Sequence, residues 1–221
     1  MWLCHHVDTS PYPHVYMKII AVVSQKGGSG KTTLSINIAV DAERAKKPSL
    51  IIDLDPQGSA ATWGDIRQLL PPSVTAITPP RLKAVLDSAE SNRAALVVID
   101  TAPHSEQAAL AAARLADLVL IPCRTALFDL RAIQQSLDIA ALAKTPAFVV
   151  LNAVQPRGTR EAESRQALEA MGAAVAPISI VERVAYQDAV ALGRGVSEYE
   201  RDKAATEMHD LFKWLQREVS F

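Results

Sequence analysis

The chain has 221 residues, of which 49% are hydrophobic and 21% charged, and its formal net charge is −1. These values exclude a disordered chain and predict one globular domain with a sizeable core. The near-zero charge gives no general attraction to nucleic acid, so any DNA contact requires a local basic patch. The two cysteines, Cys4 and Cys123, have neither CxxC spacing nor a cluster of ligands around them, which argues against a zinc site and a disulfide framework.

Residues 1–16 have neither helical nor strand periodicity and precede a second methionine, Met17. The apolar part of this segment is too short for the core of a signal peptide, and no small-residue cleavage site follows it. We therefore expect a disordered extension over residues 1–16 and a single folded domain over residues 17–221. No apolar run in the sequence is long enough to span a bilayer.

Beyond this extension, short apolar runs alternate with helical patterns. Lys18–Ser24 is rich in β-branched residues and leads into a glycine-rich loop, so it is predicted to be a buried strand. A helix is expected over Thr32–Lys46, with Pro48 just beyond its end. A second buried strand is predicted at Ser49–Asp53, and a short edge strand at Val74–Ile77.

The same alternation continues through the rest of the chain. One helical face is formed by Leu82, Val85, Leu86 and Ala89. Further strands, each preceded by an alanine-rich or amphipathic helix, are expected at Ala95–Asp100, Leu118–Pro122, Ala147–Leu151 and Ala174–Ile178. Continuous apolar strands that alternate with helices predict an α/β fold in three layers, with a mostly parallel twisted sheet flanked by helices on both faces. Ligands of such sheets bind beyond the carboxyl ends of the strands.

The C-terminal segment is predicted to be an amphipathic helix. Its apolar stripe consists of Met208, Leu211, Phe212, Leu215 and Val219. The polar face mixes acidic and basic residues without a basic bias, which favours packing against the sheet over docking on a membrane.

A phosphate-binding loop is predicted at Gln25–Thr33, which reads QKGGSGKTT between a strand and a helix. Its glycines allow several backbone N–H groups to point at one anion, and the following helix adds its dipole. Lys31 is expected to reach the β- and γ-phosphates of a nucleotide, and the Thr32 hydroxyl to bind Mg²⁺. The residues expected to bind the nucleotide here are Gly27, Gly28, Ser29, Gly30, Lys31, Thr32 and Thr33.

Three aspartates follow two of the predicted strands. Asp53 and Asp55 belong to DLDPQG at the end of one strand, and Asp100 ends the strand ALVVID and begins DTAP. Asp53 is expected to hold Mg²⁺ through water, and Asp55 to orient or deprotonate the attacking water. Asp100 matches the pattern of a hydrophobic strand that ends in a carboxylate near the magnesium shell. Aspartates at strand ends also cap turns and helices, which is the alternative for each of them.

The motif KGGSGKTT, with DLDPQG and DTAP, resembles the deviant Walker A set of the ParA/MinD superfamily, within the P-loop NTPase fold. The resemblance runs from Met17 nearly to Phe221 and is closest to short ParA-type ATPases that lack an N-terminal helix-turn-helix domain. It implies that Lys26 crosses to the nucleotide of a partner subunit in an ATP-bound dimer. A second cation near the γ-phosphate stabilises charge in the transition state. Lys26, Lys31 and Asp55 are therefore the expected catalytic residues.

The resemblance also assigns roles in the C-terminal half. Asn152 lies where the family often places an adenine-contacting asparagine, and the loop that begins at Pro177 is expected to close over the base. Arg183, Arg194 and Lys203 are the candidates for non-specific, salt-sensitive contacts with DNA phosphates. Each of these cations is also compatible with an ordinary solvated surface charge.

The resemblance implies a cytoplasmic, nucleoid-associated switch ATPase with the cofactors ATP and Mg²⁺. It would dimerise on ATP, bind DNA non-specifically and segregate or position a plasmid, a chromosome or another large cargo. A ParB-like centromere-binding or adaptor protein is expected to stimulate hydrolysis, and no membrane contact is expected. The alternatives are a MinD-like membrane-associated positioning ATPase and, with less support, a biosynthetic ligase of the dethiobiotin-synthetase type. The iron protein of nitrogenase is excluded because paired cluster cysteines are missing near the third strong strand.

Overall fold

The computed structural model describes residues 16–68, 70–125, 127–199 and 203–221, so the extension expected over residues 1–16 lies, apart from Tyr16, outside the described residues. Within the described part, the strands form a parallel sheet in the order β3-β2-β4-β1-β5-β6. The strands are β1 (Lys18–Val22), β2 (Ser49–Asp53), β3 (Ser73–Ala76), β4 (Leu96–Asp100), β5 (Leu118–Arg124) and β6 (Ala147–Asn152). The predicted α/β fold with a parallel sheet is confirmed.

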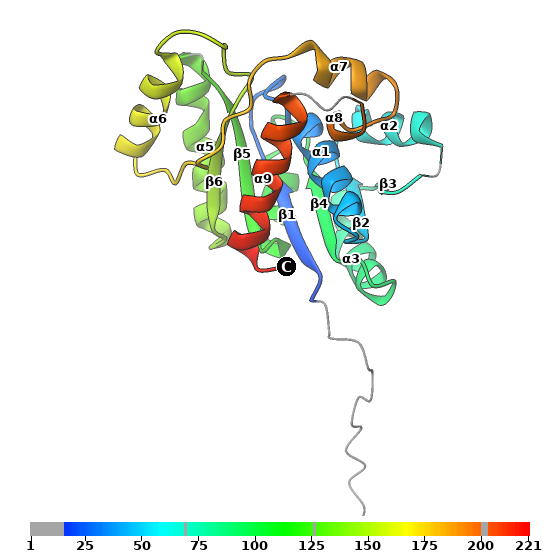
Figure 1. The fold of residues 1–221 in the computed structure, drawn as a ribbon. Coiled ribbons are helices and arrows are strands. Elements are labelled where there is room, and N and C mark those ends of the chain that lie inside the picture. The colour runs from blue at the N-terminus through cyan, green and yellow to red at the C-terminus, as the bar shows by residue number, and fades with distance from the viewer. Residues whose placement is uncertain (1–15, 69, 126, 200–202) are drawn as a thin grey trace, which may run out of the picture.

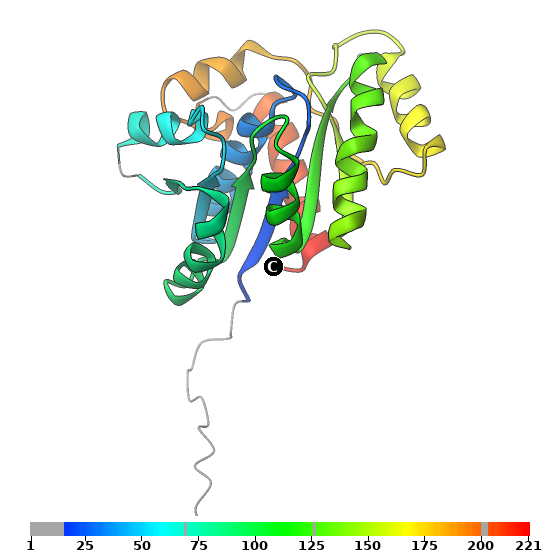
Figure 2. The ribbon, with the colours of Figure 1, turned by 180° about the vertical axis from the view of Figure 1, so that it is seen from behind.

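Helices cover both faces of the sheet, as Figures 1 and 2 show from opposite sides. The helices are α1 (Lys31–Arg44), α2 (Ser59–Arg67), α3 (Leu82–Ser91), α4 (Glu106–Leu115), α5 (Leu127–Ala143), α6 (Arg160–Ala170), α7 (Val184–Ala191), α8 (Val196–Tyr199) and α9 (Lys203–Val219), with a 3-10 turn, η1 (Pro79–Arg81), before α3. One apolar core joins the sheet to α1, α2, α7, α8 and α9, and a second joins its other face to α3, α4, α5 and α6. The central strands are buried from both sides, which explains their unbroken apolar sequences.

The apolar stripe of α9 packs against the sheet, as its periodicity predicted. Met208, Leu211, Phe212, Leu215 and Val219 are all buried. Beside them, the Trp214 ring meets Phe148 of β6 edge to face, with 4.9 Å between the ring centroids. Among the described residues, no helix combines the length and the apolar character needed to cross a bilayer.

The strand expected at Ala174–Ile178 does not form. The segment runs beside β6, where Val149 donates its N–H to the Ala174 carbonyl and accepts from the Ala176 N–H, which leaves a single isolated bridge. The next ladder bond would go to the Ala176 carbonyl, which instead accepts from the Arg165 Nη1 atom at 2.8 Å, so pairing stops after one bridge. The chain then returns to the sheet at Ile180, whose N–H donates to the Leu151 carbonyl at 2.8 Å.

Candidate functional site

The loop between β1 and α1 is shaped by contacts with β6. Gly30 adopts the left-handed conformation (φ 95°) at the N-cap of α1, which favours glycine. The Asn152 side-chain amide donates to the Ser29 carbonyl at 2.7 Å. A Cβ at Gly30 would clash with the Asn152 Nδ2 atom, so this position tolerates only glycine without a rearrangement. The loop is therefore held open by a side chain from the far edge of the sheet.

Lys31 lies in the cavity that this loop encloses. The cavity has a volume of about 340 Å³. Its lining consists of Gly27, Gly28, Gly30, Lys31, Thr32, Thr33, Asp55, Ser59 and Pro103. The Lys31 ammonium donates to the Lys26 carbonyl at 3.3 Å. Burial lowers the Lys31 pKa, and the charges of Asp100 and Asp55 act in the opposite direction. The arrangement suits an ammonium that binds an anion shielded from bulk water.

Asp53 connects the end of β2 to α2. One of its carboxylate oxygens accepts the Asp55 N–H at 2.9 Å, and the other accepts the N–H groups of Ala60 and Ala61 at 3.0 Å each. Asp53 is 1% exposed. It therefore caps the first turn of α2 and fixes the start of the following loop, which is the alternative role expected for strand-end aspartates.

Asp55 turns back toward the cavity in this loop. Its Oδ1 atom accepts the Gln57 N–H at 2.9 Å, and its half-buried side chain lines the cavity with Lys31. The Asp55 carboxylate thus lies beside the space expected to hold phosphate, with a second oxygen available to orient water.

Asp100 is fully buried, and among the described residues no hydrogen bond of normal geometry reaches its carboxylate oxygens. It lies opposite Asp53 in the register of β2 and β4. Burial raises the Asp100 pKa to about 7; the nearby Thr32 hydroxyl and Lys31 charge act in the opposite direction, whereas Asp53 and Asp55 raise it further. An unsatisfied buried carboxylate of this kind is what a divalent cation would compensate.

The donor set resembles that of magnesium more than that of zinc. Among the described residues, no group of three or more His, Cys, Asp or Glu side chains is arranged to hold a metal by itself. Mg²⁺ usually keeps several waters and binds through one or two carboxylates together with substrate phosphates. Thr32 and the two strand-end aspartates therefore fit a magnesium ion that arrives with a phosphorylated ligand.

The structure brings the predicted loop residues and all three aspartates to the carboxyl end of β1, β2 and β4. The other expected site residues lie in different surroundings. Lys26 is half-buried, and its backbone N–H donates to the Ser24 hydroxyl at 3.3 Å. Asn152 contacts the loop through its side-chain amide, and Pro177 is exposed in the segment beyond β6.

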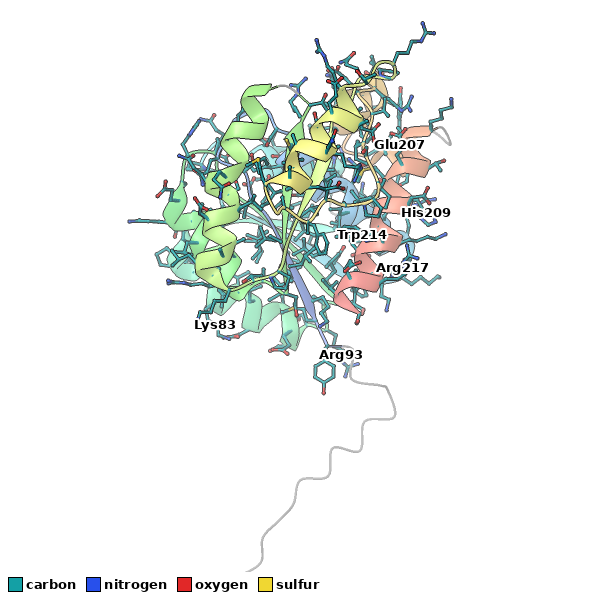
Figure 3. All side chains as sticks on the ribbon, turned by 90° about the vertical axis from the view of Figure 1, so that its left-hand side faces the viewer. Lys83, Arg93, Glu207, His209, Trp214 and Arg217 are labelled. Carbon is teal, nitrogen blue, oxygen red and sulfur yellow. The ribbon has the colours of Figure 1, made fainter. Side chains whose placement is uncertain are left out.

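The candidate DNA-contacting cations lie outside the cavity. Arg183 forms an ion pair with Glu207, a residue in the upper part of α9 in Figure 3. Arg194 is exposed in the turn between α7 and α8, and Lys203 is exposed at the first position of α9.

Two residues of the cavity wall were not predicted as site residues. Ser59 begins α2, and Pro103 follows β4 in the DTAP segment. The signal for Ser59 is its place directly after DLDPQG, where a helix start brings side chains to the same edge of the sheet. The sequence also contains no sign of a hydrogen bond from the Gln25 N–H to the buried Ser136 hydroxyl at 3.3 Å. The two residues are 111 positions apart, so no local pattern connects them.

Comparisons with known proteins agree with this geometry. The profile of the CobQ/CobB/MinD/ParA nucleotide binding domain matches residues 20–196. The chain is 38% identical over 154 residues to the maintenance of carboxysome distribution protein A of Gloeobacter kilaueensis, an alignment that covers 68% of this chain and 70% of the relative.

Two solved structures have the same fold. The ATP complex of a McdA variant from Cyanothece has a TM-score of 0.73 and 20% identity, and the match covers 93% of this chain and 97% of that one. The septum site-determining protein MinD of Pyrococcus horikoshii, complexed with Mg-ADP, has a TM-score of 0.73 and 16% identity, over 91% of this chain and 96% of that one.

Proposed function

This chain belongs to the CobQ/CobB/MinD/ParA nucleotide-binding family, and on that premise we propose that it is a positioning ATPase that binds DNA and moves a large cargo. It is an ATPase of the ParA/MinD type whose cofactors are ATP and Mg²⁺. The observation that carries the proposal is the cavity that Lys31 and Asp55 line together with the glycine-rich loop, where the nearby charge of Asp100 also acts on the Lys31 ammonium. Magnesium, when bound with the nucleotide, neutralises charge on the phosphates.

The residues of the chain bind the nucleotide and the metal and promote hydrolysis. The loop N–H groups and Lys31 would bind and orient the triphosphate, and the Thr32 hydroxyl, Asp53 and Asp100 would hold the metal with its waters. Asp55 orients the attacking water and accepts its proton. Lys26 completes the site of a second subunit, so hydrolysis requires the ATP-bound dimer.

DNA binding is proposed for the surface that carries Arg194 and Lys203. Both side chains are exposed, so they can contact phosphates at the surface. Arg183 contributes less than the other two, because its guanidinium already pairs with Glu207. Contacts of this kind position the protein on the duplex but do not read its sequence.

The cargo is proposed by analogy with the relative from Gloeobacter, whose name refers to the distribution of carboxysomes. A large body or replicon is moved when an adaptor protein of the ParB type stimulates hydrolysis and releases the dimer from the nucleoid. The carboxysome is one such body; plasmids and chromosomes are others.

The test is binding of the purified chain to random-sequence duplex DNA, with ATP and Mg²⁺ and without them. We expect ATP-dependent binding that weakens as salt rises. The double variant Arg194→Ala, Lys203→Ala should bind weakly, with a salt slope reduced by about one for each phosphate-binding cation removed. The variant Arg93→Met is the matched control, because Arg93 is exposed at the opposite end of the molecule in Figure 3. Binding to anionic vesicles without any binding to DNA would reject the proposal in favour of a MinD-like function.

A further inference from the structure

The turn that presents Arg194 is held by two helices that begin at the nucleotide site. We call residues 193–195 (Gly-Arg-Gly) the Arg194 turn; it connects α7 to α8. Its backbone is buried at both glycines, whereas the Arg194 side chain is exposed. The turn therefore offers one cation to a ligand and its main chain to the rest of the protein.

Arg67, the last residue of α2, ties that helix to the turn. Its Nη1 atom donates to the Gly193 carbonyl at 2.9 Å, and its two Nη atoms each donate to one oxygen of the Glu198 carboxylate at 2.7 Å. Two further bonds, at 3.0 and 2.5 Å, go to the Pro71 carbonyl. The second partner, Glu198, accepts the Gly195 N–H at 3.0 Å. The guanidinium is thus fully occupied, in a geometry that lysine cannot reproduce.

Trp63, one turn earlier in α2, adds a second connection. Its indole N–H donates to the Arg194 carbonyl at 3.2 Å, and the Arg67 guanidinium lies 4.9 Å from the centroid of its ring. The backbones also approach closely: a Cβ at Gly193 would lie 2.8 Å from the backbone nitrogen of Arg67. Any displacement of α2 must therefore displace the Arg194 turn.

Helix α1 holds the other side of the turn. The Asn37 side-chain carbonyl accepts the Val196 N–H at 2.7 Å, and Asp41 accepts the Ser197 hydroxyl. A Cβ at Gly195 would lie 2.7 Å from the Val40 side chain. The Arg194 turn thus packs closely against both α1 and α2.

Both helices start among the groups expected to bind nucleotide and metal. Helix α1 begins at Lys31, and the first turn of α2 is capped by Asp53. Asp53 already accepts three backbone N–H groups, so engagement with a hydrated metal would compete with its hold on α2. A change in the occupancy of the site therefore acts directly on the helix that carries Trp63 and Arg67.

We propose that Arg67, acting with Glu198, is a positioning residue that transmits the nucleotide state of the site to the Arg194 turn and so sets how Arg194 is presented to a polyanion. The identification of that polyanion as duplex DNA rests on the proposed function. The mechanical link between site and turn does not, since it stands on the contacts of α1 and α2 alone.

The first experiment uses Trp63 as a probe in the full chain. Phenylalanine replaces the other two tryptophans, Trp2 and Trp214, and emission is recorded with and without ATP and Mg²⁺. We expect nucleotide to change the Trp63 emission, because its indole N–H bond and its stacking on Arg67 both lie in the link. An emission spectrum that nucleotide leaves unchanged would overturn the proposal.

The second experiment breaks the link. In Arg67→Met, ATP affinity measured with a fluorescent analogue should stay within about threefold of the parent, while the Trp63 response is abolished and the gain in DNA affinity that ATP provides falls to within about twofold. Arg93→Met should leave both readouts unchanged. An Arg67→Met protein that keeps the full emission change and the full ATP-dependent gain would refute the link while leaving the proposed function intact.

Milder variants protect the test against misfolding. Glu198→Gln keeps the shape of the acceptor but removes its charge, and Arg67→Lys keeps the charge but not the fork, so each should reduce the Trp63 response only in part. Full responses in both variants would contradict the proposal. If the parent chain never binds DNA but Arg67→Met still abolishes the Trp63 response, the proposed function fails and the link stands.

Discussion

At the scale of single residues, Asp100 is the least satisfied group in the nucleotide site. No hydrogen bond of normal geometry reaches its buried carboxylate from the described residues, and its pKa is raised to about 7 mainly by that burial. Such a group destabilises the folded chain whenever it is ionised, unless a cation arrives to compensate it. Asp100 thus favours the metal-loaded state over the empty one.

This property predicts a pH dependence for the nucleotide-free protein. A carboxyl with a higher pKa in the folded chain than in the unfolded chain binds its proton more tightly when folded, so stability falls as pH rises from the ordinary aspartate pKa of 3.8 to about 7. The contribution of Asp100 is roughly 4 kcal/mol at most. Thermal melting without metal should show that the parent chain is less stable at about pH 8 than at about pH 5. This loss of stability should be smaller in Asp100→Asn. An equal drop in both proteins would contradict the assignment.

At the scale of elements, the sequence predicted the strands, helices and loops whose formation depends on a local residue pattern. Apolar runs located the strands from β1 to β6, and the glycine-rich motif placed the loop before α1. Helices α2, α7 and α8 were not predicted as elements, because they are short and are held by distant contacts, such as those of Trp63 with the Arg194 carbonyl and of Val196 with Asn37. The expected strand at Ala174–Ile178 was wrong, because the Ala176 carbonyl accepts from Arg165 instead of continuing the ladder with β6 after one bridge.

The same distinction applies to the site. The loop and its aspartates follow motifs of a few residues, so their positions could be predicted. The bond from Asn152 to the Ser29 carbonyl joins residues 123 positions apart, and no local pattern encodes it. The resemblance suggested a contact with adenine instead, and that role stays a prediction.

Asn152→Ala separates the two roles. If the amide mainly supports the loop, its removal leaves the Ser29 carbonyl without this donor and weakens every triphosphate ligand by about tenfold, whatever the base. The measurement is the competition of ATP and of inorganic triphosphate against a fluorescent nucleotide. Weakening of ATP alone would show that Asn152 reads adenine. Asn92→Ala is the control, since the Asn92 side chain is exposed and bonds only within its own helix region.

At the scale of the whole molecule, the sheet order places β1 between β4 and β5. The loop after β1 therefore lies beside Asp100 of β4 and near the carboxyl end of β2, so that motifs separated by tens of residues meet at one edge. The face around this edge is where a second subunit would approach if Lys26 acts across a dimer.

Lys26→Ala tests that arrangement. The variant should bind ATP through Lys31 but remain monomeric, because the cation that reaches the partner's phosphates is missing. Light scattering with a nonhydrolysable ATP analogue measures the mass, and Lys83→Ala, at the far end of the molecule in Figure 3, is the control. A persistent nucleotide-dependent dimer of Lys26→Ala would rule out the trans role.

The double duty of Asp53 has a consequence for mutagenesis. An asparagine at this position would have to turn its NH₂ group toward either the Asp55 N–H or the N–H groups of Ala60 and Ala61, so a donor would face a donor in both orientations. The helix start would loosen even in a protein that never meets magnesium. Loss of activity in Asp53→Asn would therefore be a poor diagnostic of metal ligation, and glutamate or alanine at this position would confound the two effects as well.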